Sequence, residues 1–355
     1  MLAELEAALR RLRDQTGDTL LLAVVRMGFG GLLLNEAWLA TQQLRTAGYF
    51  GGYFHQAFLP EGLVPSEGVY QGVLALQFVA AAMVIAGRGA RPALLVASTL
   101  LIATMLWDRL WFHHYRHTMA AFSALLAFTP CDRHFAVGRP ADDAPGPLWA
   151  QNAIKAQVSL MYLASGGSKL LDPEWRGGQM MLGMVQGLSR MKGGHLPMEL
   201  VSSMQTPLGA SLLAKSAIGT ELALAFALWG PRTRRLAIWV GLMFHLAISQ
   251  LTPVRLFTIE MLLVYLLFVT PDVAARVVRY DPGRHPFVRI VESLDWLRRF
   301  KLVATEGGPL VVVDRGGEEK RGLAAVATVV GAVPLFFPAW PLVAALAAVA
   351  SHRRR

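Results

Sequence analysis

Lys169 is the side chain of this sequence best placed to act as a base, because it stands near the end of an apolar run beside two glycines, Gly166 and Gly167. Glycines let a substrate or a neighbouring helix approach closely. Burial in apolar surroundings disfavours the charged form of a lysine and can leave a neutral amine, which accepts protons. The alternative is a lysine whose long side chain reaches for the membrane interface, and position alone favours neither reading.

A run of histidines, His113, His114 and His117, supplies the next candidates. His113 and His117 are four residues apart, which places them on one helical face at a spacing that can ligate a metal. A membrane di-iron site needs several such boxes, so we expect no metal and read the run as an interfacial polar turn. The single cysteine, Cys131, leaves no CxxC pair for redox or zinc chemistry.

The composition indicates that these residues belong to a membrane protein. Of 355 residues, 54% are hydrophobic and only 16% are charged, whereas soluble proteins average about 25% charged residues. The formal net charge of +10 could suggest nucleic acid, but the basic residues stand in short clusters at the ends of apolar runs. The sequence therefore argues against a soluble enzyme and against a nucleic-acid partner, and it favours a lipid bilayer.

The apolar runs predict an all-α polytopic bundle with eight membrane spans. They are residues 19–40, 68–86, 92–112, 117–130, 149–171, 208–230, 236–252 and 256–270. Residues 1–17 precede them as an amphipathic helix on the membrane surface. Lys and Arg gather in alternate loops, and the positive-inside rule then places both termini in the cytoplasm.

The C-terminal segment, residues 272–355, predicts a small cytoplasmic α/β unit. Its charge pattern is that of a soluble tail, with a helix over 286–299, a strand over 310–314 and a turn at Gly316 and Gly317. Prolines break the apolar stretch 322–350 into two short helices, which either enter the membrane or pack on the sheet.

Ionisable side chains inside spans are costly, so each is a candidate functional residue. The predicted topology gathers several of them in the outer half of the bundle. His113, His114 and His117 stand at the turn between the third and fourth spans, and Lys169 stands at the end of the fifth span. His245 lies in the seventh span, and Arg255 and Glu260 lie at the start of the eighth. Glu221, in the sixth span, is expected to form a structural ion pair with Arg26 or Lys215.

Three segments in order carry a family resemblance. They are Arg116-His117 leading to Thr129-Pro130-Cys131-Asp132-Arg133, then Met161-Tyr162-Leu163-Ala164-Ser165-Gly166-Gly167-Ser168-Lys169-Leu170 with Trp175 and Gly178, and Phe244-His245-Leu246 with Ser249-Gln250-Leu251. Residues 18–271 thereby resemble the membrane domain of the vitamin K-dependent γ-glutamyl carboxylase family, whose bacterial relatives carry the horizontally transferred transmembrane (HTTM) domain. The resemblance implies a bacterial inner-membrane location.

The resemblance also implies an activity. Lys169 is similar to the family's catalytic lysine, which deprotonates vitamin K hydroquinone. The implied cofactor of this chain is a reduced quinone, either vitamin K hydroquinone or menaquinol, and the implied co-substrates are O2 and CO2. His117 and His245 match supporting histidines. The implied pocket includes His113, His114, Trp175, Gly166, Gly167, Arg255 and Glu260. The implied acceptor is an exported peptide or protein.

One departure from the carboxylase family's pattern bears on this reading. The outer loop 172–207 is much smaller than the substrate-binding lumenal domain of the animal enzymes. A non-catalytic membrane scaffold, or a maturation or immunity partner for an exported peptide, is therefore the alternative function. The tail resembles a DCC-type thioredoxin-like domain through Tyr280-Asp281-Pro282-Gly283 and Leu294-Asp295-Trp296, but Gly283-Arg284-His285-Pro286-Phe287 stands in place of its CxxC motif.

Overall fold

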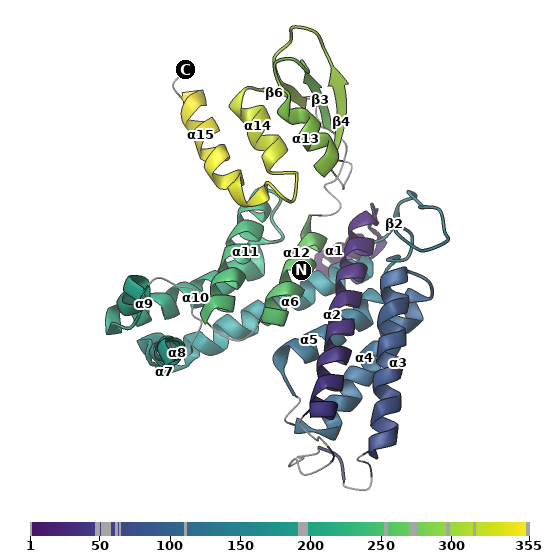
Figure 1. Ribbon diagram of the computed structural model, residues 1–355. Helices are drawn as coiled ribbons and strands as arrows, with labels where there is room; N and C mark the ends of the chain where they lie inside the picture. Colours follow the sequence, from purple (N-terminus) through teal and green to yellow (C-terminus); the bar gives the residue numbers. More distant parts are fainter. Residues whose placement is uncertain are drawn as a thin grey trace. The chain divides into compact units, whose positions relative to one another are not determined.

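The chain divides into two units in a computed structural model, which describes residues 2–46, 50, 58–60, 63, 65–109, 112–190, 198–251, 255–269, 276–295, 299–314 and 317–352. The helical unit comprises Met1–Trp229 and Gly241–Thr270, and the sheet unit comprises Gly230–Val240 and Pro271–Arg355. Figure 1 shows the helices of the first and the small sheet of the second. Both secondary-structure classes expected from the sequence are therefore present.

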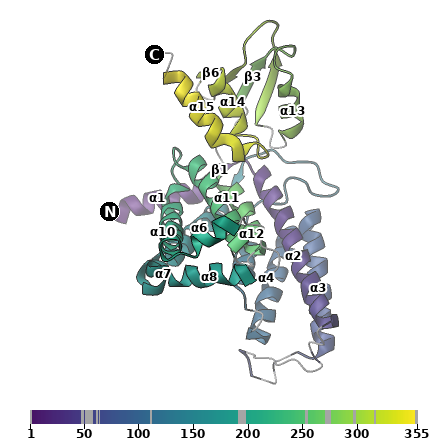
Figure 2. The same cartoon turned by 60° about the vertical axis from the view of Figure 1, so that its left-hand side comes forward.

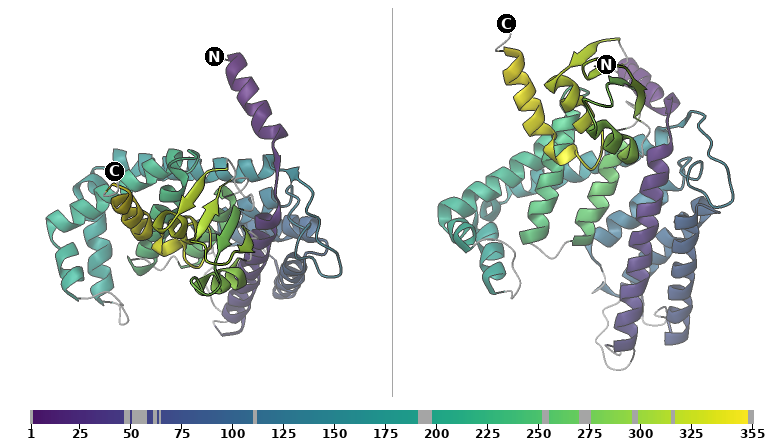
Figure 3. Two further views of the ribbon diagram at one scale, coloured as in Figure 1. Left: turned by 90° about the horizontal axis from the view of Figure 1, so that it is seen from above. Right: turned by 45° about the horizontal axis from the view of Figure 1, so that its top comes forward.

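The helical unit is a succession of helices. They are α1 (Leu2–Asp14), α2 (Leu20–Thr46), α3 (Glu67–Ala86), α4 (Ala90–Trp107), α5 (His114–Leu126), α6 (Trp149–Leu171), α7 (Pro173–Gly177), α8 (Gln179–Arg190), α9 (Met198–Met204), α10 (Pro207–Ala227), α11 (Arg234–Leu251) and α12 (Arg255–Tyr265), with a 3-10 turn, η3 (Leu266–Phe268), at the end. The boundary between the units falls within α11. Helices α6 and α10 pack side by side (Figure 2), as do α2 and α3 (Figure 3).

Among the described residues, four helices are long and apolar enough to cross a membrane. They are Leu20–Leu44 within α2, then α3, α4 and α10. Large apolar side chains cover their outer faces: Val79 is 55% exposed and Phe226 is 68% exposed. Such faces are unfavourable in water and favourable in lipid. The helical unit is therefore a membrane domain.

The other expected spans coincide with α5, α6, α11 and α12. α5 has 13 residues and α12 has 11, fewer than the roughly 20 that a span needs. α6 has 23 residues, but Gln151, Lys155 and Tyr162 are buried along it and make it less apolar. The ends of three expected spans, at residues 110–111, 252 and 270, lie outside the described residues.

Helix α1 confirms the amphipathic helix expected near the N-terminus. Asn152 at the start of α6 donates its side-chain amide to the backbone oxygen of Leu12 at 3.1 Å. Just beyond α1, β1 (Thr16–Gly17) pairs antiparallel with β2 (Gly146–Pro147). These contacts fix the end of α1 to the segment that begins α6, and its position on a membrane surface stays a prediction.

The sheet unit is built on four strands in the order β4-β3-β5-β6. β3 (Arg276–Tyr280) is parallel to β4 (Phe300–Ala304) and antiparallel to β5 (Val311–Val313), and β5 pairs antiparallel with β6 (Glu319–Arg321). Helix α13 (Phe287–Leu294) connects the two parallel strands. Helix α14 (Leu323–Val330), a 3-10 turn, η4 (Phe337–Ala339), and α15 (Trp340–His352) follow.

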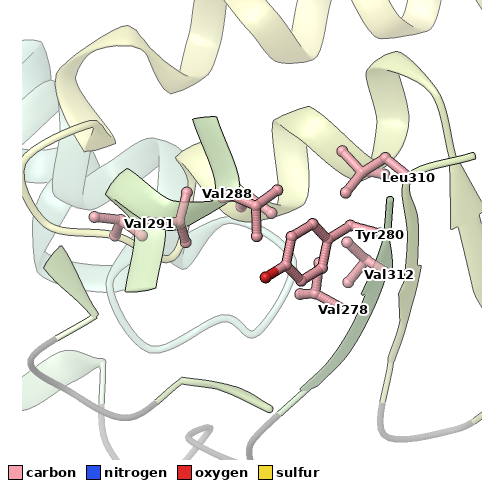
Figure 4. Packing of buried hydrophobic residues seen from close by; sticks show 9 residues of the cluster. Val278, Tyr280, Val288, Val291, Leu310 and Val312 are labelled. Atoms are coloured by element: carbon pink, nitrogen blue, oxygen red, sulfur yellow. The ribbon is translucent and has the colours of Figure 1, made fainter. Parts of the chain in front are cut away.

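A compact apolar core joins this sheet to its helices. Val278, Tyr280, Leu310 and Val312 from the strands and their edges meet Val288 and Val291 from α13 (Figure 4). Ala325 and Val329 of α14 belong to the same core. The prolines do divide residues 322–350 into two helices, and α14 packs on the sheet.

The structure corrects the helix expected over 286–299. α13 ends at Leu294, because the carboxylate of Asp295 accepts the backbone N–H groups of Arg299 and Phe300, each at 2.8 Å, and turns the chain into β4. The strand expected over 310–314 is present as β5, whereas β3, β4 and β6 were not predicted. Gly317 forms part of the expected turn with a φ of 77°; Gly316 and Trp296 lie outside the described residues.

Asp281, directly after β3, ties together two loops of the sheet unit. Its carboxylate accepts the backbone N–H of Gly283 and that of Gly307, both at 2.8 Å. These hydrogen bonds, first that from Gly283, hold the pKa of the Asp281 carboxyl below its ordinary value. Arg284 adds a hydrogen bond from its guanidinium to the backbone oxygen of Gly307 at 3.1 Å. The carboxylate of Asp281 thus holds the loops at Gly283 and Gly307 together.

Candidate functional site

Lys169 forms an ion pair with a carboxylate from another helix. Its Nζ lies 2.5 Å from Oε1 and 2.7 Å from Oε2 of Glu221, and it donates to Oγ of Ser165 at 2.8 Å. The side chains of Lys169 and Glu221 are 19% and 7% exposed. We refer to Lys169, Glu221, Ser165 and Trp175 as the lysine cluster. The amine of Lys169 therefore contacts three oxygen atoms in a largely buried setting.

Close packing of α6 against α10 produces this pair. A Cβ on Gly166 would lie 2.9 Å from Cγ of Leu222 and 3.2 Å from Cβ of Glu221, so a larger residue would force the two helices apart. Ser165 precedes Lys169 by one helical turn and shares its face. The expectation that Gly166 permits a close helix approach is confirmed. A Cβ on Gly167 would meet nothing within 4 Å.

Trp175 reaches the same amine from a short helix that follows α6. Pro173 occupies the first turn of α7, and the side chain of Asp172 caps it by accepting the N–H of Glu174 at 2.8 Å. The turn places the Trp175 ring centroid 5.1 Å from Nζ of Lys169, within cation–π range. An aromatic face and a basic nitrogen thus stand side by side.

A second polar cluster lies deeper, where α6, α11 and α12 meet. The hydroxyl of Tyr162 lies 2.6 Å from Nε2 of His245 and is hydrogen-bonded to the hydroxyl of Tyr265. The three residues are 5%, 1% and 2% exposed. We refer to Tyr162, His245 and Tyr265 as the tyrosine–histidine cluster. It holds two phenolic O–H groups and one imidazole, all able to carry protons.

Glu260 and Arg116 are buried in other polar contacts of the helical unit. Glu260 is fully buried on α12 and accepts the hydroxyl of Thr118 at 2.9 Å. Arg116 stands just before the fourth predicted span, 117–130, but it lies inside α5 with its side chain 1% exposed, 3.0 Å from the carboxylate of Glu36. A charged residue can enter the bundle here because its counter-charge is buried beside it.

The histidine run is exposed, unlike the residues of the two polar clusters. His113, His114 and His117 are all exposed. The ring of His113 stacks on Tyr115 and that of His117 lies 6.2 Å from Phe112. Arg255 is exposed at the start of α12. No contact between these residues and the lysine cluster is found in the described part of the chain. The structure joins Lys169 to Trp175 and places Gly166 against Glu221, but it does not join Lys169 to the histidine run.

The prediction that Glu221 forms an ion pair with Arg26 or Lys215 was wrong. Arg26 is buried elsewhere and donates to the backbone oxygen of Phe135 at 2.8 Å, and Lys215 is exposed on α10. Glu221 meets Lys169 instead. The sequence contains no local sign of this, because the two residues stand 52 positions apart. Tyr162 and Tyr265 were also missed, although Tyr162 precedes Lys169 by two helical turns on the same face of α6.

The described side chains were compared with the groupings that a metal ion needs. No group of three or more His, Cys, Asp or Glu residues there could hold a metal ion.

Comparison with known proteins gives one match. A family model described as the HTTM domain matches residues 15–273, which contain both polar clusters. No curated protein and no solved structure matches the chain.

Proposed function

Because the chain belongs to the HTTM domain family, a carboxylase-related family of membrane proteins, we propose that it is a membrane enzyme in which Lys169 acts as a base toward a reduced quinone. The observation that carries the proposal is the lysine cluster: a partly buried amine, a carboxylate and a hydroxyl in mutual contact, beside the face of Trp175.

The residues of this cluster suit the deprotonation of a quinol hydroxyl. An amine in its neutral form takes the proton, and Ser165 and Glu221 then accept hydrogen bonds from the ammonium that forms. Trp175 offers an aromatic face for a quinone ring. The carboxylate holds the positive charge in place where water is scarce, which strengthens the electrostatic interaction.

The later steps are those of the resembled carboxylases. The quinolate reacts with O2, the product leaves as an epoxide, and the strongly basic oxygen formed on the way removes a proton from an acceptor carbon that then takes up CO2. His245 and His117 are proposed in support of these steps, and an exported peptide or protein is the proposed acceptor. A water-poor pocket would protect the carbanion from protons.

The decisive experiment measures epoxide formation from vitamin K hydroquinone, and separately from menaquinol, by the purified protein in lipid nanodiscs. Lys169→Ala should lower the rate about 10²- to 10⁴-fold, the range that a general base contributes. The matched control is Lys215→Ala, which removes an exposed lysine of α10. Glu221→Gln should reduce the rate less than Lys169→Ala, since the base itself remains.

Equal epoxide formation by Lys169→Ala and the folded parent protein would overturn the catalytic role. Absence of epoxide from both quinols would favour the alternative, a membrane scaffold or a maturation partner, for which the ion pair of Lys169 and Glu221 is purely structural. Co-purification of an exported peptide that survives Lys169→Ala would then identify that role.

We further propose the eight-span arrangement with both termini in the cytoplasm of a bacterial inner membrane. The alternation of basic loops supports it. Single-cysteine accessibility in a Cys131→Ser background tests it: a cysteine at Arg139 should react with an impermeant thiol reagent only after the membrane is opened, and one at Arg176 should react in intact cells. The reverse pattern would invert the topology.

For the sheet unit we propose a thioredoxin-like core that lacks thiol chemistry. Its parallel β3-α13-β4 unit, antiparallel β5 and β6, and following α14 support this reading. Arg284→Cys with Phe287→Cys places a C-x-x-C pair at the start of α13. In a thioredoxin-like core this pair should form an intramolecular disulfide with a reduction potential of about −120 to −270 mV. Failure to form it would contradict the fold assignment.

A further inference from the structure

Helix α15, the last of the sheet unit, carries an apolar outer face. Leu342, Leu346 and Val349 are 67%, 52% and 55% exposed, and Leu335, in the turn before the helix, is 62% exposed. The three helix residues follow one another at spacings of four and three residues, so they share one face of α15. Contact of such a stripe with water is unfavourable, and a stripe of this kind marks a surface that binds protein or membrane.

The opposite face of α15 is occupied within the sheet unit. α15 packs against α14 (Figure 1). A Cβ on Gly331 would lie 2.8 Å from Nε1 of Trp340, so this glycine lets the first residue of α15 pack against the end of α14. Trp239, in the part of α11 that belongs to the sheet unit, donates its indole N–H to the backbone oxygen of Pro338 at 2.9 Å. These contacts fix which face of α15 points outward.

The sequence of this region is charge-free and then abruptly basic. It contains no Asp, Glu, Lys or Arg from Leu323 to Ser351, and it ends in Arg353-Arg354-Arg355. A helix that is apolar all round is normally buried, either in protein or in a membrane. α15 has 13 residues and is therefore about 20 Å long, shorter than the roughly 30 Å hydrocarbon core of a bilayer. It therefore suits a position in the plane of a membrane surface better than a span.

Two further features favour anionic lipid as the cover of this face. The connection from Phe268, at the end of η3, to Arg276, at the start of β3, can extend at most about 30 Å, so the bilayer around the helical unit is always close. The three arginines complement anionic head groups, and each favours binding to such a surface by about five-fold. A second copy of this stretch would offer them no acidic side chain, because Leu323 to Ser351 contains none.

We propose that α15 is an in-plane anchor that docks the sheet unit on an anionic bilayer surface. Leu342, Leu346 and Val349 enter the region between head groups and acyl chains, and the arginines that follow the helix meet lipid phosphates. The inference goes beyond the proposed quinol chemistry and does not depend on it. It gives the sheet unit a binding surface of its own, formed by the one helix of the unit whose outer face is apolar along its length.

The test measures what surrounds the outer face of α15 in the full-length protein. Single nitroxide labels are attached at Leu342→Cys, Leu346→Cys and Val349→Cys in a Cys131→Ser background, and the protein is placed in nanodiscs of phosphatidylcholine with phosphatidylglycerol. Collision rates with O2, which concentrates in lipid, and with a water-soluble nickel chelate report the surroundings of each label. The matched control is Ile290→Cys, at an apolar site of α13 that is 55% exposed. The ratio of O2 to nickel collisions should be several-fold higher at the three α15 sites than at this control.

The same data distinguish the possible covers. Leu342 and Val349 are seven residues apart, or about 10 Å along the helix axis, so similar depths at both sites support an in-plane helix. Depths that differ by about that distance would show a helix entering end-on and would overturn the proposal. Low collision rates with both reagents would show a cover of protein, and nickel access equal to that at Ile290 would show water; either result also overturns it.

A second measurement tests the role of charge. Replacement of Arg353, Arg354 and Arg355 by glutamine should raise the ratio of released to docked α15, read from nickel access at the Leu346→Cys label, by up to about 10²-fold in the anionic nanodiscs. Nanodiscs of phosphatidylcholine alone should shift the parent protein in the same direction. Nickel access that is the same in the triple variant and the parent protein, and in both kinds of nanodisc, would overturn the assignment of anionic lipid.

Discussion

In the helical unit the side chains of Arg116 and Glu36 are 1% and 3% exposed, whereas Leu212 and Phe226 of α10 are 59% and 68% exposed. In the sheet unit the order is reversed: Val278 and Val312 are at most 1% exposed, and the side chain of Arg321 is 68% exposed. The difference follows from the surroundings of each unit. Lipid provides no hydrophobic drive for burying leucine, and it does make unpaired charge costly, so polar groups go inside.

Helix α15 departs from this contrast. Leu342, Leu346 and Val349 of the sheet unit are 67%, 52% and 55% exposed, a pattern closer to that of α10. Its partner helix α14, by contrast, contributes to the sheet core. The two short helices predicted from the prolines of residues 322–350 thus differ: α14 packs on the sheet, while α15 keeps an apolar outer face.

The largest change in stability is expected when a buried charge is removed from the helical unit. Arg116→Met leaves the carboxylate of Glu36 buried without its cation, and the stability should fall by about 3–5 kcal/mol. Thermal unfolding in detergent, followed by size-exclusion fluorescence, measures the loss. The double variant Arg116→Met with Glu36→Gln should recover most of it. A single variant as stable as the parent protein would show that the pair lies in water.

The matching change in the sheet unit removes apolar volume. Val312→Ala deletes two methyl groups at the centre of the core (Figure 4), so the sheet should lose about 2 kcal/mol. Val79→Ala, at a lipid-facing site of α3, is the control and should change stability little. Hydrogen exchange of the backbone amides of β3 and β5 in the full chain reports the first effect. Equal losses for both variants would remove the distinction between the units.

A smaller effect is expected at the loop that Asp281 closes. Asp281→Ala should destabilise the sheet unit at neutral pH, because the amides of Gly283 and Gly307 lose their acceptor. The pKa of this carboxyl is lowered by folding, so its contribution is present above its unfolded pKa and is lost as pH falls through the folded one. Amide exchange at Gly307, measured from pH 7 downward, should converge for parent and variant in acid. A constant difference would contradict the assignment.

The smallest effect belongs to the exposed ion pairs of the sheet unit. Arg279→Gln breaks the contact with Glu319 at 3.2 Å, where the side chains are 50% and 36% exposed. Solvent screens such pairs, so the unfolding midpoint should stay within experimental error of the parent value. A clear drop that disappears in high salt would show a stronger pair than its exposure indicates.

Much of the fold follows from patterns that act over one helix or strand. Apolar runs predicted the positions of α2, α3, α4 and α10, and the glycines beside Lys169 predicted a close helix approach. The α13 terminus was misplaced because a single carboxylate, Asp295, decides it through two backbone N–H groups. β3, β4 and β6 were missed because short strands draw their stability from partners elsewhere in the chain.

The sequence by itself determined that this chain belongs in a membrane, that it ends in a small α/β unit, and that Lys169 stands beside glycines on an apolar helix. Only the tertiary structure decided what Lys169 touches. Its contact with Glu221 spans 52 positions, and Tyr162 meets His245 and Tyr265 across 83 and 103. The physical reason is that side chains on different helices become neighbours through packing of whole helices, and helical periodicity says which face is polar but not which polar face it will meet.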